Sequence, residues 1–197
     1  TCLIHNDWRF DNVILAADDP TKVIGVLDWE MATLGDPLMD LGSALAYWIE
    51  EDDNIIMQQS RRQPTHLKGM MTRDEVVTYY LEKTGLKIDN WTFYEVFGLF
   101  RLAGIVQQIY YRYYNKQTSN PAFKNFWIIV HVLHAKCLKL IAQYEGEALF
   151  ISHVQPHLQD MGVDASMIEQ LPSPIQTVIK GILPKSYFGQ NTSKAKE

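Results

Sequence analysis

The feature that most constrains this fold is a pair of short apolar runs, residues 13–15 and 23–27, close to the start of the chain. They flank residues 16–22, a segment with the Asp, Pro and Thr residues typical of turns. Short β-branched runs on both sides of such a turn predict an antiparallel hairpin. A hairpin brings the start of its first strand beside the end of its second. We therefore expect Asn12, before the first run, to lie next to Asp28, after the second.

An amide oxygen and a carboxylate that converge in this way suit a hard cation such as Mg²⁺. Asp7 precedes Asn12 in the same loop, and we expect it to face the same point. The spacing His-x-Asp-x4-Asn, then a hairpin and a second Asp, matches the catalytic loop and metal-binding Asp of kinases. There, the first Asp accepts the proton of the substrate hydroxyl, while the Asn and the second Asp hold the metal ions on the nucleotide phosphates.

Four motifs carry a more specific resemblance: HNDWRFDN at 5–12, GVLDWE at 25–30, GDP at 35–37 and DL at 40–41. Together they resemble the aminoglycoside phosphotransferase family, a kinase-like family that includes choline and fructosamine kinases. The most similar branch is the phosphotransferase domain found fused to acyl-CoA dehydrogenases, in which Gly usually occupies the position of Asn6. Asn tolerates left-handed backbone angles better than most residues, so this departure is mild.

The resemblance implies that Asp7 is the catalytic base and that Asn12 and Asp28 bind Mg²⁺. It implies ATP or GTP as the phosphate donor and the hydroxyl of a small molecule as the acceptor. Five further residues are expected to support the site: His5, Arg9, Glu30, Asp36 and Asp40.

Three of these acidic residues have more than one interpretation. Asp36 precedes Pro37 and is expected to cap the following helix. The alternative is that Asp36 or Asp40 supports the Asp7 loop from behind or takes a direct part in the chemistry. Glu30 follows Asp28 by two positions, so in an extended segment the two side chains point to the same side. A role beside the metal and a solvated carboxylate both stay open for Glu30.

Beyond the hairpin, the sequence predicts mainly helices. Apolar periodicity and end signals predict them at residues 38–49, 73–84, 90–114 and 121–144. The helix at 90–114 is apolar on almost every side and is expected to be the buried centre of a bundle. Residues 50–71 are expected to form a long loop, in which the acidic run 50–53 is solvated or, alternatively, attracts a cationic substrate.

The predicted fold class is thus α+β and mostly α-helical. It is a protein-kinase-like C-terminal lobe, in which a small catalytic β-hairpin is followed by a helical bundle. This lobe is expected to cover residues 1–184, and residues 185–197 are expected to form a disordered tail.

The chain has 197 residues, which fits one domain with a sizeable core. Its net charge of −5 argues against general binding of nucleic acid. Cys2 and Cys137 are interpreted as reduced thiols of a cytoplasmic protein. The most apolar stretch, residues 126–138, contains two His and one Lys and is interpreted as too short and too polar to span a membrane.

A kinase-like enzyme also needs a preceding lobe that covers and grips the nucleotide phosphates. The catalytic loop begins at residue 5, so we expect this chain to work with an N-terminal lobe of a longer protein and to be nearly inactive alone. The apolar face left by that lobe would favour a homodimer.

Two other functions compete with the kinase. One is a non-catalytic partner or regulatory lobe, although such a lobe has no chemical reason to keep Asp7, Asn12 and Asp28 together. The other is a metal-dependent hydrolase that uses Asp7 and Asp28, which leaves Asn12 without an explanation. The acceptor substrate stays open between a cationic amine, suggested by the acidic run, and a hydroxylated acyl compound, suggested by the acyl-CoA dehydrogenase branch.

Overall fold

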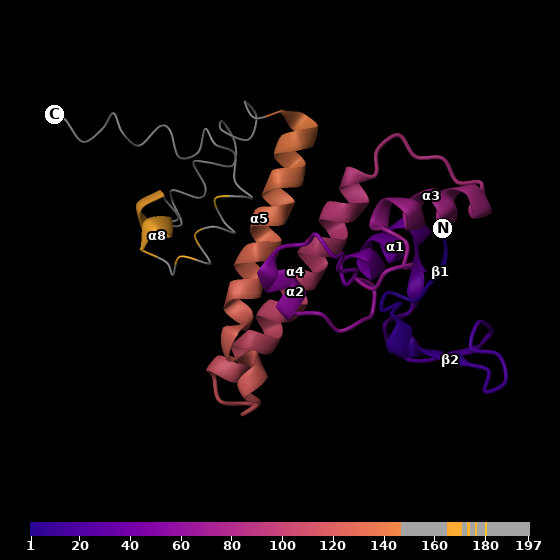
Figure 1. The fold of residues 1–197 in the computed structure, drawn as a ribbon, viewed down its shortest axis with the longest axis horizontal. Coiled ribbons are helices and arrows are strands. Elements are labelled where there is room, and N and C mark those ends of the chain that lie inside the picture. The colour runs from indigo at the N-terminus through magenta and orange to yellow at the C-terminus, as the bar shows by residue number, and fades with distance from the viewer. Residues whose placement is uncertain (147–164, 171–172, 174–175, 177–179, 181–197) are drawn as a thin grey trace. The chain divides into compact units, whose positions relative to one another are not determined.

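The N-terminal residues form two small antiparallel sheets, and one of them is the predicted hairpin (Figure 1). Strand β2 (Val13–Leu15) pairs with β3 (Val23–Val26), with Val13 opposite Val26. At the base of the hairpin, the N–H of Leu27 donates to the carbonyl oxygen of Asn12 at 2.8 Å. The hairpin prediction is therefore confirmed.

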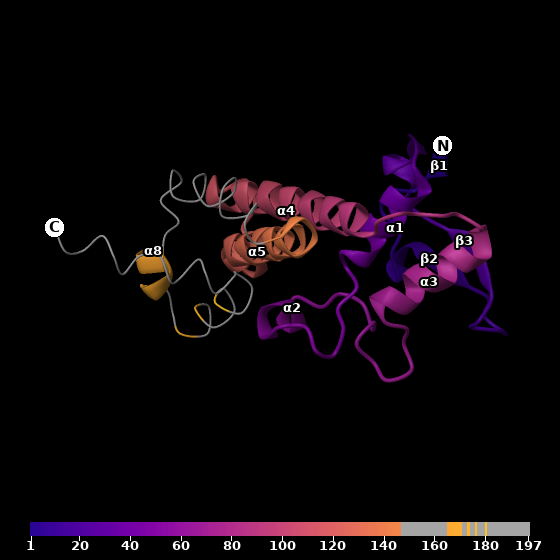
Figure 2. The same ribbon diagram turned by 90° about the horizontal axis from the view of Figure 1, so that it is seen from above.

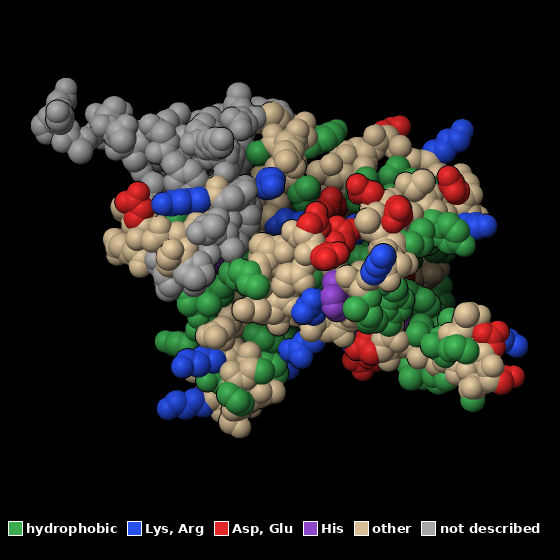
Figure 3. All heavy atoms as spheres, viewed as in Figure 1, with side chains coloured by type: hydrophobic (Ala, Val, Ile, Leu, Met, Phe, Trp, Pro, Cys, Tyr) green, Lys and Arg blue, Asp and Glu red, His purple; other side chains and the backbone are tan. Residues whose placement is uncertain are grey.

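The second sheet was not predicted. In it, β1 (Cys2–Ile4) pairs with β4 (Thr33–Gly35), so that Leu3 lies opposite Leu34. This pairing brings the first residues of the chain beside the segment that follows Asp28. Several large apolar side chains on the two sheets are exposed, and apolar side chains reach the surface around the hairpin in Figure 3: Leu3, Ile14, Leu15, Val23, Ile24 and Leu34.

The computed structural model describes residues 1–146, 165–170, 173, 176 and 180. The chain divides into two units, Thr1–Ile105 and Val106–Glu197, and the boundary falls within the long helix α4 (Thr92–Tyr114). The predicted tail, residues 185–197, lies outside the described residues, as does most of the segment before it.

In the first unit, α1 (Pro37–Leu45) begins as predicted, because the carboxylate of Asp36 accepts a hydrogen bond from the N–H of Leu38 at 2.9 Å. The predicted end at residue 49 is wrong. After Leu45 the chain winds into tighter turns, and the backbone of Ile49 hydrogen-bonds to the side chain of Thr65 instead of continuing the helix.

Segment 50–71 is mostly irregular, as predicted, but it is not a free loop. It contains α2 (Ile55–Gln59), visible in Figure 2, and is fastened at both ends. Arg73, the first residue of α3 (Arg73–Thr84), forms ion pairs with Glu50 at 2.8 Å and Asp53 at 2.6 Å. These two carboxylates are therefore neither simply solvated nor available to attract a cationic substrate.

Helix α3 has the predicted ends. Thr72 and Glu75 form the capping box at its start, and Gly85 follows its last residue with a φ of 69°. Helix α4 begins at Thr92, slightly later than predicted, after the side chain of Asn90 has accepted the N–H of Thr92.

Burial along α4 differs from the prediction of an all-round buried helix. Leu99 is buried, but Phe93 is 60% exposed and Phe100 is 72% exposed. Composition shows that a helix is apolar, but it does not show which of its faces the neighbouring elements cover.

The backbones of α1 and α4 touch at two glycines. A Cβ atom on Gly98 would lie 2.0 Å from the carbonyl oxygen of Gly42, and one on Gly42 would lie 2.3 Å from the carbonyl oxygen of Tyr94. No side chain fits between backbones at this distance. The absence of a Cβ atom therefore sets how closely α1, which follows the candidate site, approaches α4.

We expect Gly98→Ala to lower the free energy of unfolding by about 1–3 kcal/mol, since the two backbones must separate. Gly104→Ala, in the same helix, is the matched control because nothing lies within 4 Å of its Cβ position. It should raise the free energy of unfolding by up to about 1 kcal/mol through helix propensity. Urea denaturation of both variants measures the difference, and equal effects would contradict the backbone contact.

The second unit holds the end of α4, a 3-10 turn at Pro121–Asn125, α5 (Phe126–Glu145) and α8 (Ala165–Glu169). The helix predicted at 121–144 is confirmed apart from this first turn. Among the described residues of this unit, the most buried large side chains are those of Val132, Leu133 and Ile168. The helical segment Pro121–Tyr144 has 24 residues, and a window of 18 residues within it has a mean hydropathy of 1.3. By length and composition alone it could cross a membrane, so the argument from a short apolar stretch was wrong about length.

Candidate functional site

The catalytic loop predicted at residues 5–12 connects β1 to β2, and it brings Asp7 and Asn12 together. The side-chain amide of Asn12 donates to the backbone carbonyl of Asp7 at 2.7 Å and lies 3.3 Å from its carboxylate Oδ2. Asn12 is buried, with an exposed fraction of 7%, whereas the Asp7 side chain keeps 19% of its surface exposed. A buried amide thus orients a carboxylate that a substrate can still reach.

His5 ties the loop to the hairpin. Its Nε2 lies 2.7 Å from the carbonyl oxygen of Leu27, and its Nδ1 accepts the N–H of Asp7 at 3.2 Å. These partners require a neutral ring with its proton on Nε2, because Nδ1 is already an acceptor and a carbonyl oxygen can only accept. His5 is 4% exposed, and its ring packs against that of Trp29 with centroids 4.7 Å apart.

Asp40 holds the loop from behind, which was one of the two roles open for it. Its carboxylate oxygens accept the backbone N–H of His5 at 2.7 Å and that of Asn6 at 2.8 Å. Asn6 has a φ of 65°, the left-handed conformation expected for this position. Asp36 has a different role, since it caps α1 and also accepts the hydroxyl of Tyr94 at 3.0 Å.

We expect Asp40→Asn to lower the free energy of unfolding by about 1–3 kcal/mol, because the new amide nitrogen must face a backbone N–H that it cannot satisfy. Asp74→Asn is the matched control, since Asp74 also lies in the first turn of a helix but is exposed. Thermal unfolding of both variants makes the comparison. Equal losses would mean that Asp40 acts only on the helix dipole and not on the loop.

The two predicted metal ligands lie at the base of the hairpin. The amide nitrogen of Asn12 donates to Asp7, and no hydrogen bond to its Oδ1 is formed by the residues that the structure describes. Asp28 follows Leu27, whose N–H is bonded to Asn12, and it is exposed with φ 62° and ψ 53°. Within the described residues, the Asp28 carboxylate makes no hydrogen bond or ion pair. The amide oxygen of Asn12 and the carboxylate oxygens of Asp28 are both of the kind that binds Mg²⁺.

The chain offers few ligands besides these. Among the described residues, no group of three or more His, Cys, Asp or Glu side chains could hold a metal ion. Asn12 and Asp28 therefore do not by themselves make a complete metal site.

One of the two interpretations left open for Glu30, a role beside the metal, was argued from a premise that is wrong. It assumed an extended segment, but Asp28 is left-handed and Trp29–Met31 forms a 3-10 turn. The alternation of side chains along a strand does not apply to these residues. Glu30 is exposed.

Arg9 lies beside the expected base. Its guanidinium is 3.3 Å from the Asp7 carboxylate, 3.5 Å from that of Asp11 and 5.3 Å above the ring of Tyr47. Burial raises the pKa of the Tyr47 hydroxyl, and the negative charge of Asp7 raises it further. Tyr47 therefore stays neutral near pH 7.

Sequence reasoning did not find Tyr47, nor Gln63, whose side chain accepts the backbone N–H of Phe10 in the catalytic loop. Both residues are far from the loop in sequence and belong to no motif.

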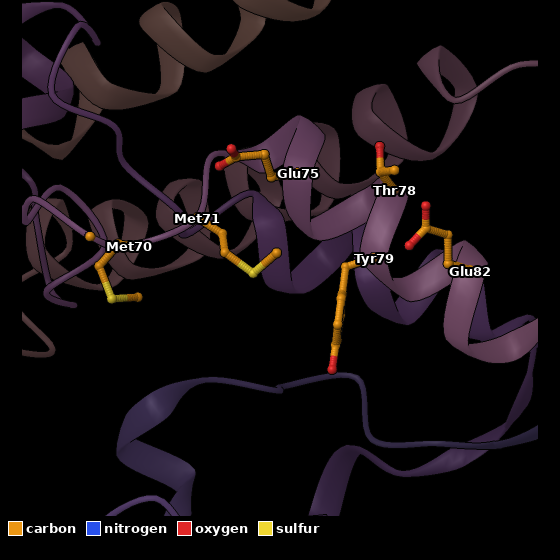
Figure 4. A pocket seen from close by; sticks show the side chains of 7 residues that line it. Met70, Met71, Glu75, Thr78, Tyr79 and Glu82 are labelled. Carbon is orange, nitrogen blue, oxygen red and sulfur yellow. The ribbon is translucent and has the colours of Figure 1, made fainter.

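A depression of about 490 Å³ along α3 is separate from these residues and is lined by Met70, Met71, Tyr79 and Glu82, among others (Figure 4). Glu75 also lines it, but its carboxylate is already bonded to Thr72.

An Asp-bearing loop, an adjacent Asn and an Asp across a small hairpin, all ahead of a set of helices, form the arrangement that kinase-like phosphotransferases share. Residues 1–73 match the phosphotransferase enzyme family. This is the family that the four motifs predicted, so the resemblance is confirmed for this segment. The solved structure described below confirms the predicted fold class.

Known proteins with similar sequences are much longer than this chain. It is 39% identical over 122 residues to acyl-CoA dehydrogenase family member 10 of Mus musculus, covering 61% of this chain and 11% of that protein. It is 35% identical over 141 residues to acyl-CoA dehydrogenase family member 11 of Homo sapiens, covering 70% of this chain and 18% of that protein.

A solved structure has a similar fold. It belongs to a protein of Ralstonia eutropha JMP134 that was provisionally named an aminoglycoside phosphotransferase. The two chains are 29% identical with a TM-score of 0.52, and the match covers 65% of this chain and 40% of the other. Family and fold together support a kinase-like phosphotransfer function in general.

Proposed function

We propose that this chain is part of a small-molecule kinase that transfers the γ-phosphate of ATP or GTP to a hydroxyl group. The observation that carries the proposal is the pair of hydrogen bonds from Asn12 to Asp7, formed at the base of the hairpin that ends in Asp28. The expected base, Asp7, and the two expected metal ligands, Asn12 and Asp28, thus all lie in the short segment between β1 and β4.

Each residue has a stated part in this proposal. Asp7 accepts the proton of the acceptor hydroxyl as the hydroxyl oxygen attacks the γ-phosphorus. The bond from that phosphorus to the oxygen bridging it to the β-phosphate breaks, and ADP or GDP leaves. Asn12 Oδ1 and the Asp28 carboxylate hold Mg²⁺, which neutralises charge on the phosphate oxygens. His5 and Asp40 keep the loop in place through its backbone, and Arg9 orients the Asp7 carboxylate.

For the acceptor, we propose a hydroxylated acyl compound rather than a cationic amine. The case for a cation depended on the acidic run, and Glu50 and Asp53 of that run are paired with Arg73. The relatives named acyl-CoA dehydrogenase family members support an acyl compound, because linked enzymes often act on related molecules.

We also propose that another part of a longer protein grips the nucleotide. In kinases, a Gly-rich loop and a strand Lys hold the phosphates from the opposite side. The supporting fact is that this chain spans only 11–18% of the length of the relatives described above. Positioning supplies about 7–11 kcal/mol of barrier lowering in favourable cases, so the segment alone should transfer phosphate very slowly.

The test is a transfer assay with Mg²⁺ and labelled ATP or GTP. Hydroxyacyl compounds, hydroxylated amines and aminoglycosides are offered as acceptors to the chain alone and to the chain fused to the nucleotide lobe of a related phosphotransferase. We expect transfer to a hydroxyacyl compound by the fusion and almost none by the chain alone. A fusion that binds Mg²⁺-nucleotide but phosphorylates nothing would favour the non-catalytic alternative.

A further inference from the structure

One contact from a distant part of the sequence reaches the catalytic loop and has no assigned role. Gln63 is 8% exposed, and its Oε1 accepts the backbone N–H of Phe10 at 2.9 Å. We propose that Gln63 is a positioning residue for Asn12: it fixes the 3-10 turn Phe10–Asn12 and, through it, the Asn12 side chain. The inference rests on the proposed function only in that Asn12 is taken as a metal ligand.

The turn needs a partner at this place. The first N–H groups of a helical turn have no acceptor within the turn itself, and Arg9, at the capping position, makes no side-chain cap. Gln63 supplies that acceptor. On the other side of the same residue, the carbonyl of Phe10 accepts the N–H of Val13, where β2 begins. Phe10 is thus held at both its N–H and its carbonyl, and Asn12 lies between Phe10 and Val13, the two residues that these bonds fix.

The acceptor is itself held firmly. Two residues after Gln63, the hydroxyl of Thr65 accepts the N–H of Ile49 at 3.0 Å and donates to its carbonyl at 2.9 Å. Thr65 is 3% exposed. The guanidinium of Arg73 donates to the carbonyl of Trp48 at 2.7 Å, and this bond joins the two ends of the segment 48–73.

The same segment supports Phe10 a second time. The ring of Trp48 packs against the ring of Phe10 with centroids 5.4 Å apart. An apolar contact and a buried hydrogen bond from one fastened segment therefore act on a single residue of the loop. The direction in which Asn12 Oδ1 points depends on this support, because Asn12 follows Phe10 by less than one turn.

Nuclear magnetic resonance of the ¹⁵N-labelled chain tests the proposal without any ligand. In Gln63→Met, which keeps the length of the side chain but not the acceptor, we expect amide exchange at Phe10 to accelerate by about fivefold or more. The side-chain amide resonances of Asn12 should shift as its bond to Asp7 loosens. Gln63→Glu should restore both signals, since a carboxylate oxygen also accepts, and a purely volumetric role would not distinguish the two variants.

Gln59→Met, an exposed position in the same segment, is the control and should change neither signal. An unchanged Asn12 resonance in Gln63→Met would overturn the proposal, even if Phe10 exchanges faster. If Gln63→Met does not fold, Gln63→Glu decides: native Asn12 resonances support the proposal and shifted ones overturn it.

Titration with Mn²⁺ separates this inference from the proposed function. We expect Mn²⁺ to broaden the resonances of Asn12 and Asp28 in the wild-type chain. Absence of broadening in the wild type would count against the metal site. The positioning role of Gln63 would still be decided by the measurements without metal.

Discussion

Asp7→Asn is expected to reduce the rate of phosphate transfer by about 10²–10⁴-fold while hardly changing the affinity for Mg²⁺-nucleotide. The reason is that Asp7 accepts a proton in the chemical step but does not hold the nucleotide. Asparagine keeps the shape of the side chain and an oxygen that can accept the Asn12 amide, so the loop should keep its structure. Initial rates of the fusion protein and calorimetric titration of nucleotide give the two quantities.

Asp11→Asn is the matched control for this experiment. Asp11 lies in the same loop and also approaches Arg9, at 3.5 Å, but its side chain is 56% exposed. It should retain nearly full activity. If both variants lost activity equally, the effect would come from the charge balance around Arg9, and Asp7 would not be the base.

The second large effect is expected at Asp28. Asp28→Asn should weaken Mg²⁺-dependent nucleotide binding on the order of a hundredfold or more, since a carboxylate brings charge to a hard cation and an amide brings only a dipole. Asparagine is chosen because it tolerates the left-handed backbone found at this residue. Asn12→Ala should weaken binding less, because it removes only a neutral oxygen.

Calorimetry with Mg²⁺-nucleotide, repeated with excess chelator, measures these affinities. The chelator gives the metal-independent background, and Asp28→Asn should bind no better than that background. Equal affinity of the wild type and Asp28→Asn would remove Asp28 from the metal site. A larger loss in Asn12→Ala than in Asp28→Asn would reverse the order of the two ligands.

The parts of this site that the sequence predicts are those set by local signals. The hairpin follows from two short apolar runs around a turn, and its geometry alone places Asn12 near Asp28. The cap at Asp36 and the left-handed Asn6 are likewise properties of a few adjacent residues. Such features depend on backbone preferences that a short stretch of sequence reveals.

The parts that the sequence does not predict are long-range pairings of polar side chains. Gln63 reaches Phe10 across 53 positions, and Arg73 pairs with Asp53 across 20. Neither pair has a periodic pattern or a motif that would distinguish it from ordinary surface residues. The acidic run shows the consequence, because without knowledge of Arg73 its carboxylates look solvated.

The backbone of Asp28 carries a consequence for how related chains are compared. A left-handed conformation disfavours most residues with a side chain by roughly 1–2 kcal/mol, Asp and Asn less than the others, and it suits glycine without steric strain. At this residue the fold and the chemistry therefore favour different amino acids. A lobe freed from catalysis gains stability by exchanging Asp28 for glycine, while a working lobe has to keep the less stable residue. Residue 28 is thus the first position to inspect when active members are separated from inactive ones.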